Sequence, residues 1–395
     1  MSKKQSVQLS PKEVTDFLNF IIKNNQELQE QGRKVSSVEV IGEAGLGKTS
    51  IVEQVAKEND LCFVKLNLSQ IEELGDLVGF PIRQFQMCKG SEELMDCLWI
   101  DEQAIHTYEK EGYTFTGEKR MSYCPPSWIA DKGPGGILLL DDWTRGDMRF
   151  IQACMELIDK QEYISWSLPK NWHVILTSNP SGGNYLVNEI DAAQKTRFIS
   201  VEMSFDKNSW AKWAESAGID GRCINFVLLH PEVVQGDNVN PRSLVTFFNT
   251  ISNIKDFNAQ LPFIQMIGEG CIGSDVTSMF VMFINNRLDK LVGPEVIAHS
   301  DWNVVKSEVI PIVGNGPTYR ADLASVLAHR YINYMTEYAK KNPVSEKQID
   351  RLEQIVKEFL FGVDLNFLIV KELFHTGSKF KGIGLRSQLA KLVIS

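Results

Sequence analysis

The stretch Val38-Glu-Val-Ile-Gly-Glu-Ala-Gly-Leu-Gly-Lys-Thr-Ser50 decides the fold of this chain. Residues 38–41 are mostly apolar and predict a buried strand, while the residues from Ser50 onward predict a helix. Between them, Gly42-x-x-x-x-Gly47-Lys48-Thr49 has the spacing of a phosphate-binding loop. The alternative, a glycine-rich turn that binds nothing, does not account for this strand-loop-helix context.

Each residue type in the loop suits a nucleotide. The glycines let backbone N–H groups converge on an anion, Lys48 supplies charge for the β- and γ-phosphates, and the Thr49 hydroxyl is placed to ligate Mg²⁺. The loop residues that we predict to bind the nucleotide are Gly42, Glu43, Ala44, Gly45, Leu46, Gly47, Lys48, Thr49 and Ser50.

Length and composition predict two or three domains. The 395 residues are too many for one ordinary core, and 43% of them are hydrophobic. The 41 basic and 50 acidic residues give a net charge of −9, which argues against a surface dedicated to nucleic acid but leaves a local basic channel open.

The N-terminus has no apolar signal core, and the apolar runs are shorter than a membrane span. We therefore expect a cytoplasmic protein without a membrane segment.

The cysteines and histidines predict neither a disulfide nor a metal centre. Seven cysteines are scattered through the predicted elements without a C-x-x-C pair, as reduced thiols of a cytosolic protein would be. Six histidines are equally dispersed and form no H-E-x-x-H pattern. We interpret both sets as core or surface residues.

Strand and helix patterns alternate through the first half of the chain. A capping box at Ser10, with proline at the first helical position, opens an amphipathic helix that Gly32 is expected to end. Helices are also predicted after Lys48 and near 147–160. Apolar strands are predicted at 38–41, 61–66, 136–142, 173–178 and 198–203. This order predicts an α/β fold, a P-loop αβα sandwich with a parallel sheet.

Two further regions differ from that pattern. Residues 80 to about 128 interrupt it, with a helix expected over 91–108 and a projecting hairpin expected about a turn at 116–119. After Asp206 helical patterns dominate. The helices expected there span 207–217, 221–230, 241–256, 275–290, 319–340, 345–361 and 364–375.

These patterns divide the chain into four parts. We expect an N-terminal helix over 1–34 and an α/β core over 35–205 that carries the insertion. A helical lid over 206–292 and a helical C-terminal extension over 293–395 follow.

Polar residues follow two of the predicted strands. Asp141 and Asp142 end the strand at 136–142, and Asn179 follows the strand at 173–178. The carboxyl ends of parallel strands are where such folds bind ligands. Asp141 could hold Mg²⁺ through its water shell, Asp142 could polarise an attacking water, and Asn179 could bond the γ-phosphate or that water. An exposed acidic turn and an Asn-Pro turn without a function are the alternatives.

Two arginines could complete the site. Arg197 lies immediately before the last predicted strand, where it could be an ordinary surface cation or an arginine finger that reaches a neighbouring subunit. Arg242 starts a helix of the second half, where it could close over the same nucleotide.

Taken in chain order, these segments resemble the AAA+ ATPases, and more narrowly the MoxR-like branch related to the dynein and midasin modules. The resemblance spans roughly residues 35–255. GEAGLGKTS matches Walker A, GILLLDDWTR Walker B, LTSNP sensor 1, DAAQKTRF the arginine-finger segment and NPRSL sensor 2. The segment SQIEELGDLVGFP at 69–81 is similar to an element of that branch.

The resemblance implies ATP and Mg²⁺ as cofactors, and a ring of identical subunits, usually a hexamer. It implies that Thr49 and Asp141 hold the metal, that Asp142 and Asn179 position water, and that Arg197 acts in trans. Many relatives remodel or activate a client protein, often one with a von Willebrand A-type domain. The second Walker B acid is usually Glu, so the shorter Asp142 predicts slow hydrolysis, and no familiar motif covers residues 295–395.

Two other functions stay open from the sequence. A nucleotide-gated assembly scaffold would follow if Asp142 hydrolyses so slowly that ATP mainly sets the oligomeric state. A DNA-associated motor would suit the ring, but the acidic balance speaks against it.

Overall fold

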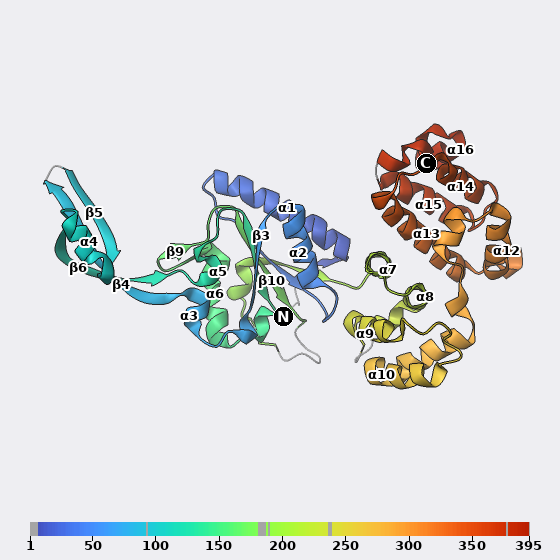
Figure 1. The fold of residues 1–395 in the computed structure, drawn as a ribbon, viewed down its shortest axis with the longest axis horizontal. Helices are drawn as coiled ribbons and strands as arrows, with labels where there is room; N and C mark the ends of the chain where they lie inside the picture. The colour runs from blue at the N-terminus through green and yellow to red at the C-terminus, as the bar shows by residue number, and fades with distance from the viewer. Residues whose placement is uncertain are drawn as a thin grey trace. The chain divides into compact units, whose positions relative to one another are not determined.

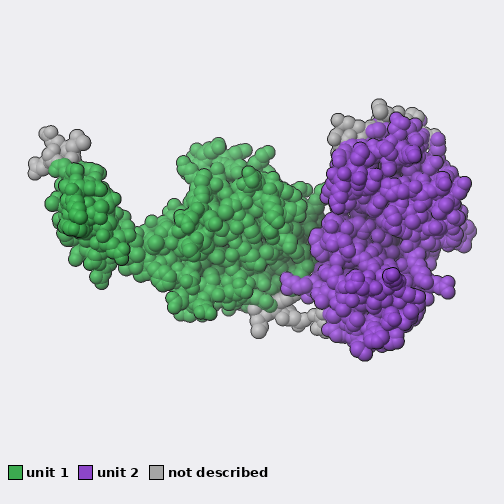
Figure 2. All heavy atoms as spheres, in the orientation of Figure 1, with its two compact units in different colours: residues 1–204 green, residues 205–395 purple. Residues whose placement is uncertain are grey.

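The computed structural model describes residues 7–91, 94–180, 187–188, 190–235, 239–376 and 378–394. The chain divides into two compact units, residues 1–204 and 205–395, coloured separately in Figure 2. Each unit is described by itself below.

A six-stranded parallel sheet forms the centre of the first unit (Figure 1). Across the sheet the strands are β1 (Val7–Leu9), β11 (Phe198–Met203), β2 (Ser37–Ile41), β10 (Trp172–Ser178), β7 (Gly136–Asp141) and β3 (Cys62–Asn67). The parallel sheet predicted from the alternating pattern is confirmed. β1 was not predicted, since three residues before a capping box are too few to show a period.

Helices cover both faces of this sheet. Side chains of α1 (Pro11–Glu30) and α2 (Lys48–Glu58) pack with Ile137 and Leu139 of β7 on one face. Side chains of α6 (Met148–Lys160) pack with Leu138 and Leu140 on the other. Because alternate residues of a strand point to opposite faces, a strand that is apolar throughout serves two cores. The first unit is therefore an αβα sandwich.

The remaining short elements of the first unit lie outside the large sheet. The helices are α3 (Leu74–Val78), α4 (Ile105–Lys110) and α5 (Ser127–Ala130), and the strands are β4 (Phe80–Ser91), β5 (Leu94–Asp101), β6 (Thr114–Cys124), β8 (Glu162–Tyr163) and β9 (Trp166–Ser167). β8 and β9 pair with each other as a two-stranded ribbon.

The insertion is a three-stranded antiparallel sheet, here called the arm, in which β4 lies between β5 and β6. The helix predicted over 91–108 is wrong apart from α4, because residues 94–101 form β5. The hairpin turn predicted at 116–119 is also wrong, because β6 runs through these residues. Gly117 has φ 93°, and the β4–β6 register shifts between Phe85 and Met87. The predicted turn is therefore a bulge inside a strand.

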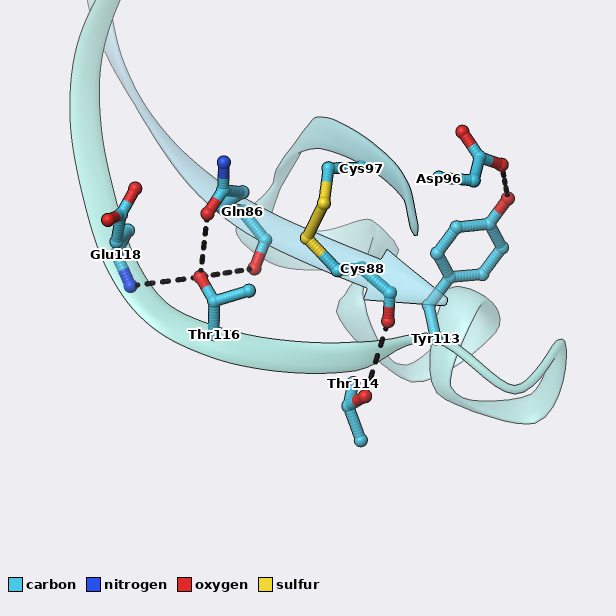
Figure 3. The surroundings of a disulfide bond; sticks show 8 residues. All are labelled: Gln86, Cys88, Asp96, Cys97, Tyr113, Thr114, Thr116 and Glu118. Carbon is cyan, nitrogen blue, oxygen red and sulfur yellow. Dashed lines mark hydrogen bonds between the residues drawn. A yellow bond between two sulfur atoms is a disulfide. The ribbon is translucent and has the colours of Figure 1, made fainter. Parts of the chain in front are cut away.

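A disulfide between Cys88 and Cys97 joins β4 and β5 (Figure 3). This corrects the expectation of reduced thiols throughout. The two cysteines face each other directly in the antiparallel register, which brings their Cα atoms to 4.1 Å. A C-x-x-C search cannot find such a pair, because antiparallel strand pairing joins cysteines nine residues apart.

The second unit is helical, as predicted. Its helices are α7 (Lys207–Ser216), α8 (Gly221–Leu229), α9 (Pro241–Ile251), α10 (Leu261–Asn285), α11 (Pro294–His299), α12 (Trp302–Val313), α13 (Ala321–Lys341), α14 (Glu346–Lys357), α15 (Val363–His375) and α16 (Ser387–Ile394). Two hydrophobic clusters fill the unit, one built mainly on α7–α10 and one on α11–α16. α13 contributes Val326 to the first cluster and Leu327 to the second, so it joins the two.

One helix of the second unit is long and apolar enough to cross a membrane by length and composition alone. α10 has 25 residues and contains an 18-residue window with a mean hydropathy of 1.3, although only its second half was predicted to be helical. Gly273 breaks its helical geometry with φ 75° and ψ 168°. On either side of the break Ile264 and Phe280 are buried in the first cluster, whereas Phe263, Met266 and Met282 of the same helix are exposed.

Candidate nucleotide site

The predicted phosphate loop connects β2 to α2 at the carboxyl edge of the large sheet. Gly47 precedes the helix with φ 90°, a left-handed conformation that glycine adopts without a steric penalty. Lys48 is the first residue of α2 and is buried. Its Nζ donates to the carbonyl oxygens of Gly42 at 2.6 Å and Glu43 at 3.0 Å, so the ammonium lies inside the turn of the loop.

The other loop residues differ in their surroundings. Leu46 packs partly buried against the cluster formed by α1 and α2, and Ser50 lies exposed in the first turn of α2. Glu43 is exposed, while Ala44 and Gly45 are half-buried.

Asp141 ends β7 and lies beside the loop threonine. Its Oδ1 accepts hydrogen bonds from Thr49 Oγ1 and from Thr177 Oγ1, both at 2.7 Å, and its Oδ2 lies 2.9 Å from Lys65 Nζ. Burial alone would raise the pKa of Asp141, but the two hydroxyl bonds and the Lys65 ammonium outweigh it and hold the pKa below its usual value. Asp141 is therefore a carboxylate at neutral pH.

The oxygen atoms of Thr49 and Asp141 fit a magnesium ion. Hydroxyl and carboxylate oxygens are the hard donors that Mg²⁺ takes, with phosphate and water completing its coordination. The 2.7 Å separation of the two side-chain oxygens places both at one point of the sheet edge. The residues predicted as metal ligands are thus adjacent in the structure.

Asn179 connects the loop lysine to the second aspartate. Its Oδ1 accepts from Lys48 Nζ at 3.1 Å, and its Nδ2 donates to Asp142 Oδ1 at 3.3 Å. The Asn179 amide can make both bonds at once, because its oxygen accepts from the lysine, which can only donate, and its NH₂ donates to the carboxylate, which can only accept. Arg145 lies 4.0 Å from the other carboxylate oxygen of Asp142. Lys48, Asn179 and Asp142 therefore form one continuous set of contacts, and Thr177 links Asp142 to the adjacent Thr49–Asp141 pair.

Asp142 has an unusual backbone. Its φ of 49° and ψ of 38° place it in the left-handed region, just before the short helical turn Trp143–Arg145. Its N–H donates to Thr177 Oγ1 at 3.0 Å. Aspartate and asparagine adopt this region more readily than other residues with side chains. The hydroxyl of Thr177 thus fixes the positions of both aspartates, one through the side chain and one through the backbone.

The two predicted arginines lie apart from this set. Arg197 follows the short helical turn Gln194–Thr196 and is exposed, and its side chain makes no hydrogen bond or ion pair with any residue that the structure describes. Arg242 is exposed in the first turn of α9, in the second unit. The site lies in the first unit and Arg242 in the second, so a contribution of Arg242 to the site stays a prediction.

Sequence reasoning missed Lys65 and Thr177. Lys65 lies in β3, which runs beside β7 in the sheet, and Asn67 of β3 is the register partner of Asp141. Thr177 lies in β10, on the other side of β7. Lys65 lies two residues before Asn67, and Thr177 lies two residues before Asn179, so strand alternation could have placed each on the same face as that residue once the strand order was known.

Comparisons with known proteins find likeness in structure only. No protein-family model matches the chain, and no curated protein matches it in sequence. The Holliday junction branch migration motor RuvB of Thermotoga maritima is 14% identical with a TM-score of 0.35, over 82% of this chain and 87% of that one. A mutant of the same protein has 13% identity and a TM-score of 0.38 over the same shares.

A provisionally assigned ATPase from Cytophaga hutchinsonii is 14% identical, with a TM-score of 0.32 over 89% of this chain and 88% of that one. Scores this low carry no argument about function. The assignment as a P-loop αβα core therefore rests on the strand order, the parallel register and the loop itself.

Proposed function

We propose that this chain is an ATPase of the AAA+ class. The observation that carries the proposal is the continuous set of contacts from Lys48 through Asn179 to Asp142, beside the Thr49–Asp141 pair. A lysine for phosphate, an oxygen pair for Mg²⁺ and a carboxylate for water are the parts that ATP hydrolysis requires. All of them lie at one edge of one sheet.

Each residue has a defined role in this proposal. The loop N–H groups and Lys48 bind the β- and γ-phosphates, and Thr49 and Asp141 hold the metal, which when bound neutralises charge on the phosphate oxygens. Asp142 orients and polarises the attacking water. Asn179 holds Asp142 relative to Lys48, and thus relative to the γ-phosphate.

The proposal extends to a ring of identical subunits, most simply a hexamer. The guanidinium of Arg197, which is exposed and makes no side-chain bond to a described residue, would supply charge to the site of a neighbouring subunit, and Arg242 would supply it from the helical lid. By its motifs the chain would be a MoxR-like remodeller that acts on a client, for which a von Willebrand A-type domain is the first candidate. Cytoplasmic residence belongs to the same proposal.

Lys48→Ala tests the site assignment. Purified protein with Mg²⁺ and ATP should hydrolyse ATP, and the variant should lose both ATP binding and turnover. Lys57→Ala is the matched control, because Lys57 is an exposed lysine of the same helix whose side chain pairs with the exposed Glu53. Turnover that survives in Lys48→Ala would show that the loop is not the catalytic site.

A second function, a slowly hydrolysing assembly scaffold, is favoured by one observation. The short carboxylate of Asp142 is already engaged by Asn179 and lies near Arg145, which limits its reach toward a water. Analytical ultracentrifugation with ATP and with ADP, run beside turnover measurements, separates the two functions. A ring that forms with ATP while turnover is negligible would favour the scaffold.

A further inference from the structure

Glu39 is a buried acidic residue in the middle of β2, the strand that leads into the phosphate loop. Only 6% of its surface is exposed. Its neighbours Val38 and Val40 point to the face covered by α1 and α2, so Glu39 points to the face covered by α6. Nothing in the nucleotide site described above uses this side chain.

The Glu39 carboxylate accepts three hydrogen bonds. Oε1 accepts from Trp143 Nε1 at 3.0 Å and from Ser178 Oγ at 2.8 Å, and Oε2 accepts from Ser200 Oγ at 2.8 Å. A buried carboxylate is costly unless such donors surround it. An indole N–H can only donate, so Oε1 must act as an acceptor. The three donors come from the segment after β7, from β10 and from β11.

Two of these donors are chain neighbours of the proposed catalytic residues. Trp143 directly follows Asp142, and Ser178 directly precedes Asn179. The carbonyl oxygen of Ser178 also accepts from the N–H of Gly42, the first glycine of the loop. One atom, Glu39 Oε1, therefore ties together the segments that carry Asp142 and Asn179, and a backbone bond ties the second segment to the loop.

Trp143 extends the same contacts toward the arginine. Its ring is fully buried and packs edge-on against Phe198, with 5.6 Å between the ring centroids. Phe198 directly follows Arg197. Trp143 thus contacts both the Glu39 carboxylate and the chain neighbour of Arg197.

We propose that Glu39 is a positioning residue that sets the distance between Asp142 and Asn179 through Trp143 and Ser178. This inference rests on the ATPase function proposed above. The water that Asp142 orients must lie in line with the γ-phosphate, and displacements near 1 Å can cost about a hundredfold in rate. Because Lys48 and the loop amides bind the phosphates directly, loss of the Glu39 contacts should affect turnover more than binding.

Two pairs of variants test this role. Ser178→Ala removes one donor to Glu39, and Ser37→Ala is its control. Ser37 is a buried serine of the same strand and face as Glu39, and its hydroxyl donates to the Ile158 carbonyl oxygen of α6 instead. Glu39→Met removes the acceptors at similar length. Glu39→Gln keeps one carbonyl oxygen for Trp143 and Ser178 and offers an amide to Ser200, whose hydroxyl can also accept.

We expect kcat to fall about tenfold in Ser178→Ala and more in Glu39→Met, with the Kd for ATP within about twofold of wild type. Glu39→Gln should recover most of the kcat lost in Glu39→Met. If Ser37→Ala loses as much kcat as Ser178→Ala, or if Kd rises as kcat falls, the role is structural and the inference is overturned.

Amide hydrogen exchange of the nucleotide-free protein tests the same inference independently of ATP turnover. Peptides covering 141–146 and 175–180 should exchange faster in Ser178→Ala than in Ser37→Ala. Equal exchange in the two variants would overturn the inference. Absence of turnover in wild type would overturn the ATPase function instead, and the exchange comparison would still decide whether Glu39 positions these segments.

Discussion

Both the side-chain length and the backbone conformation of Asp142 limit which residues can replace it. Seen in the sequence alone, Asp142 differs from the glutamate usual at this position only in having a shorter side chain. The structure adds a left-handed backbone, with φ 49°. Glutamate adopts this region less readily than aspartate, so a change to the longer acid would alter the backbone as well as the reach. Asparagine fits the backbone and removes only the charge.

Asp142→Asn should therefore separate binding from hydrolysis. Because Asn tolerates the left-handed region, the fold and the ATP affinity should stay near those of wild type. Turnover should fall by about 10²–10⁴, the usual contribution of a group that activates water. Isothermal titration and a phosphate-release assay measure the two quantities. Asp131→Asn, at an exposed aspartate, is the control, and wild-type turnover in Asp142→Asn would remove Asp142 from the mechanism.

His173 gives a prediction about acid stability. It is buried in β10, neither ring nitrogen has a hydrogen-bond partner among the described residues, and burial lowers its pKa from 6.5 to about 4. The unfolded chain binds a proton near pH 6.5, whereas the folded chain does so only near pH 4. Stability from the neutral ring is therefore complete above pH 6.5 and is lost as the pH falls toward 4.

The size of this effect is about 3 kcal/mol, at about 1.4 kcal/mol per pKa unit. His173→Leu should remove it, so the free energy of unfolding should depend less steeply on pH between 6.5 and 4 than in wild type. Denaturant titrations at several pH values measure this dependence. Parallel curves for wild type and His173→Leu would contradict the prediction.

The sequence could predict the residues of the site that belong to a motif, but not those that support them. Lys48, Thr49 and Asp141 follow from spacing, and the structure brings them together. Glu39 lies between two valines, and this alternation usually indicates a strand with one face in water. Its carboxylate is buried because Trp143 and Ser178, more than 100 residues away, donate to it. No local pattern carries that information.

At the scale of elements, the predicted strands of the large sheet are confirmed, whereas the arm was misassigned. β7 and β10 are buried along their whole length because both faces of the sheet are covered there, and their apolar runs are easy to recognise in the sequence. The arm's strands are mostly exposed on one side and interrupted by a bulge at Gly117, which weakens the alternation and imitates a turn. Its disulfide joins cysteines that only strand register brings together.

Three helices of the second unit meet at Arg330. This buried guanidinium of α13 lies 3.1 Å from Glu215 Oε1 of α7 and 3.3 Å from Asn225 Oδ1 of α8. Arg330→Met should destabilise the second unit by about 3–5 kcal/mol, because it leaves the Glu215 carboxylate buried without its partner. Hydrogen exchange of the α13 amides measures this loss.

Two further variants separate the causes of that loss. Arg320→Ala removes an exposed pair with Asp322 near the start of the same helix, and it should cost less than about 1 kcal/mol. Adding Glu215→Met to Arg330→Met should recover most of the stability, since an apolar pair replaces the buried charges. A loss below 1 kcal/mol in Arg330→Met would show that the pair is unimportant for packing.

At the scale of the whole molecule, both lysines of the site already have partners among the residues that the structure describes. Lys48 and Lys65 are engaged with the loop, Asn179 and Asp141, whereas Arg197 is exposed and makes no side-chain bond within the described residues. An exposed cation next to the last strand is what a ring could use across a subunit boundary. The exposed Arg197 guanidinium therefore supports the proposed assembly.

Arg197→Ala should lower turnover by about 10³–10⁵ while ATP binding persists. Lys195→Ala, at an exposed cation two residues earlier, should have little effect. Mixing Arg197→Ala with Asp142→Asn should restore part of the turnover, because some boundaries then pair an intact Asp142 with an intact Arg197. If mixtures stay inactive although mixed assemblies form, Arg197 is an ordinary surface residue.

The strand order also has a consequence for how the chain is made. β2 leaves the ribosome early, but its partners β10 and β11 begin about 130 or more residues later, which at roughly 10 residues per second is a delay on the order of ten seconds. Meanwhile the backbone N–H and C=O groups along both edges of β2 have no partner strand, and its apolar side chains are uncovered. The nascent first unit should therefore be a client of the cell's chaperones until residue 203 has emerged.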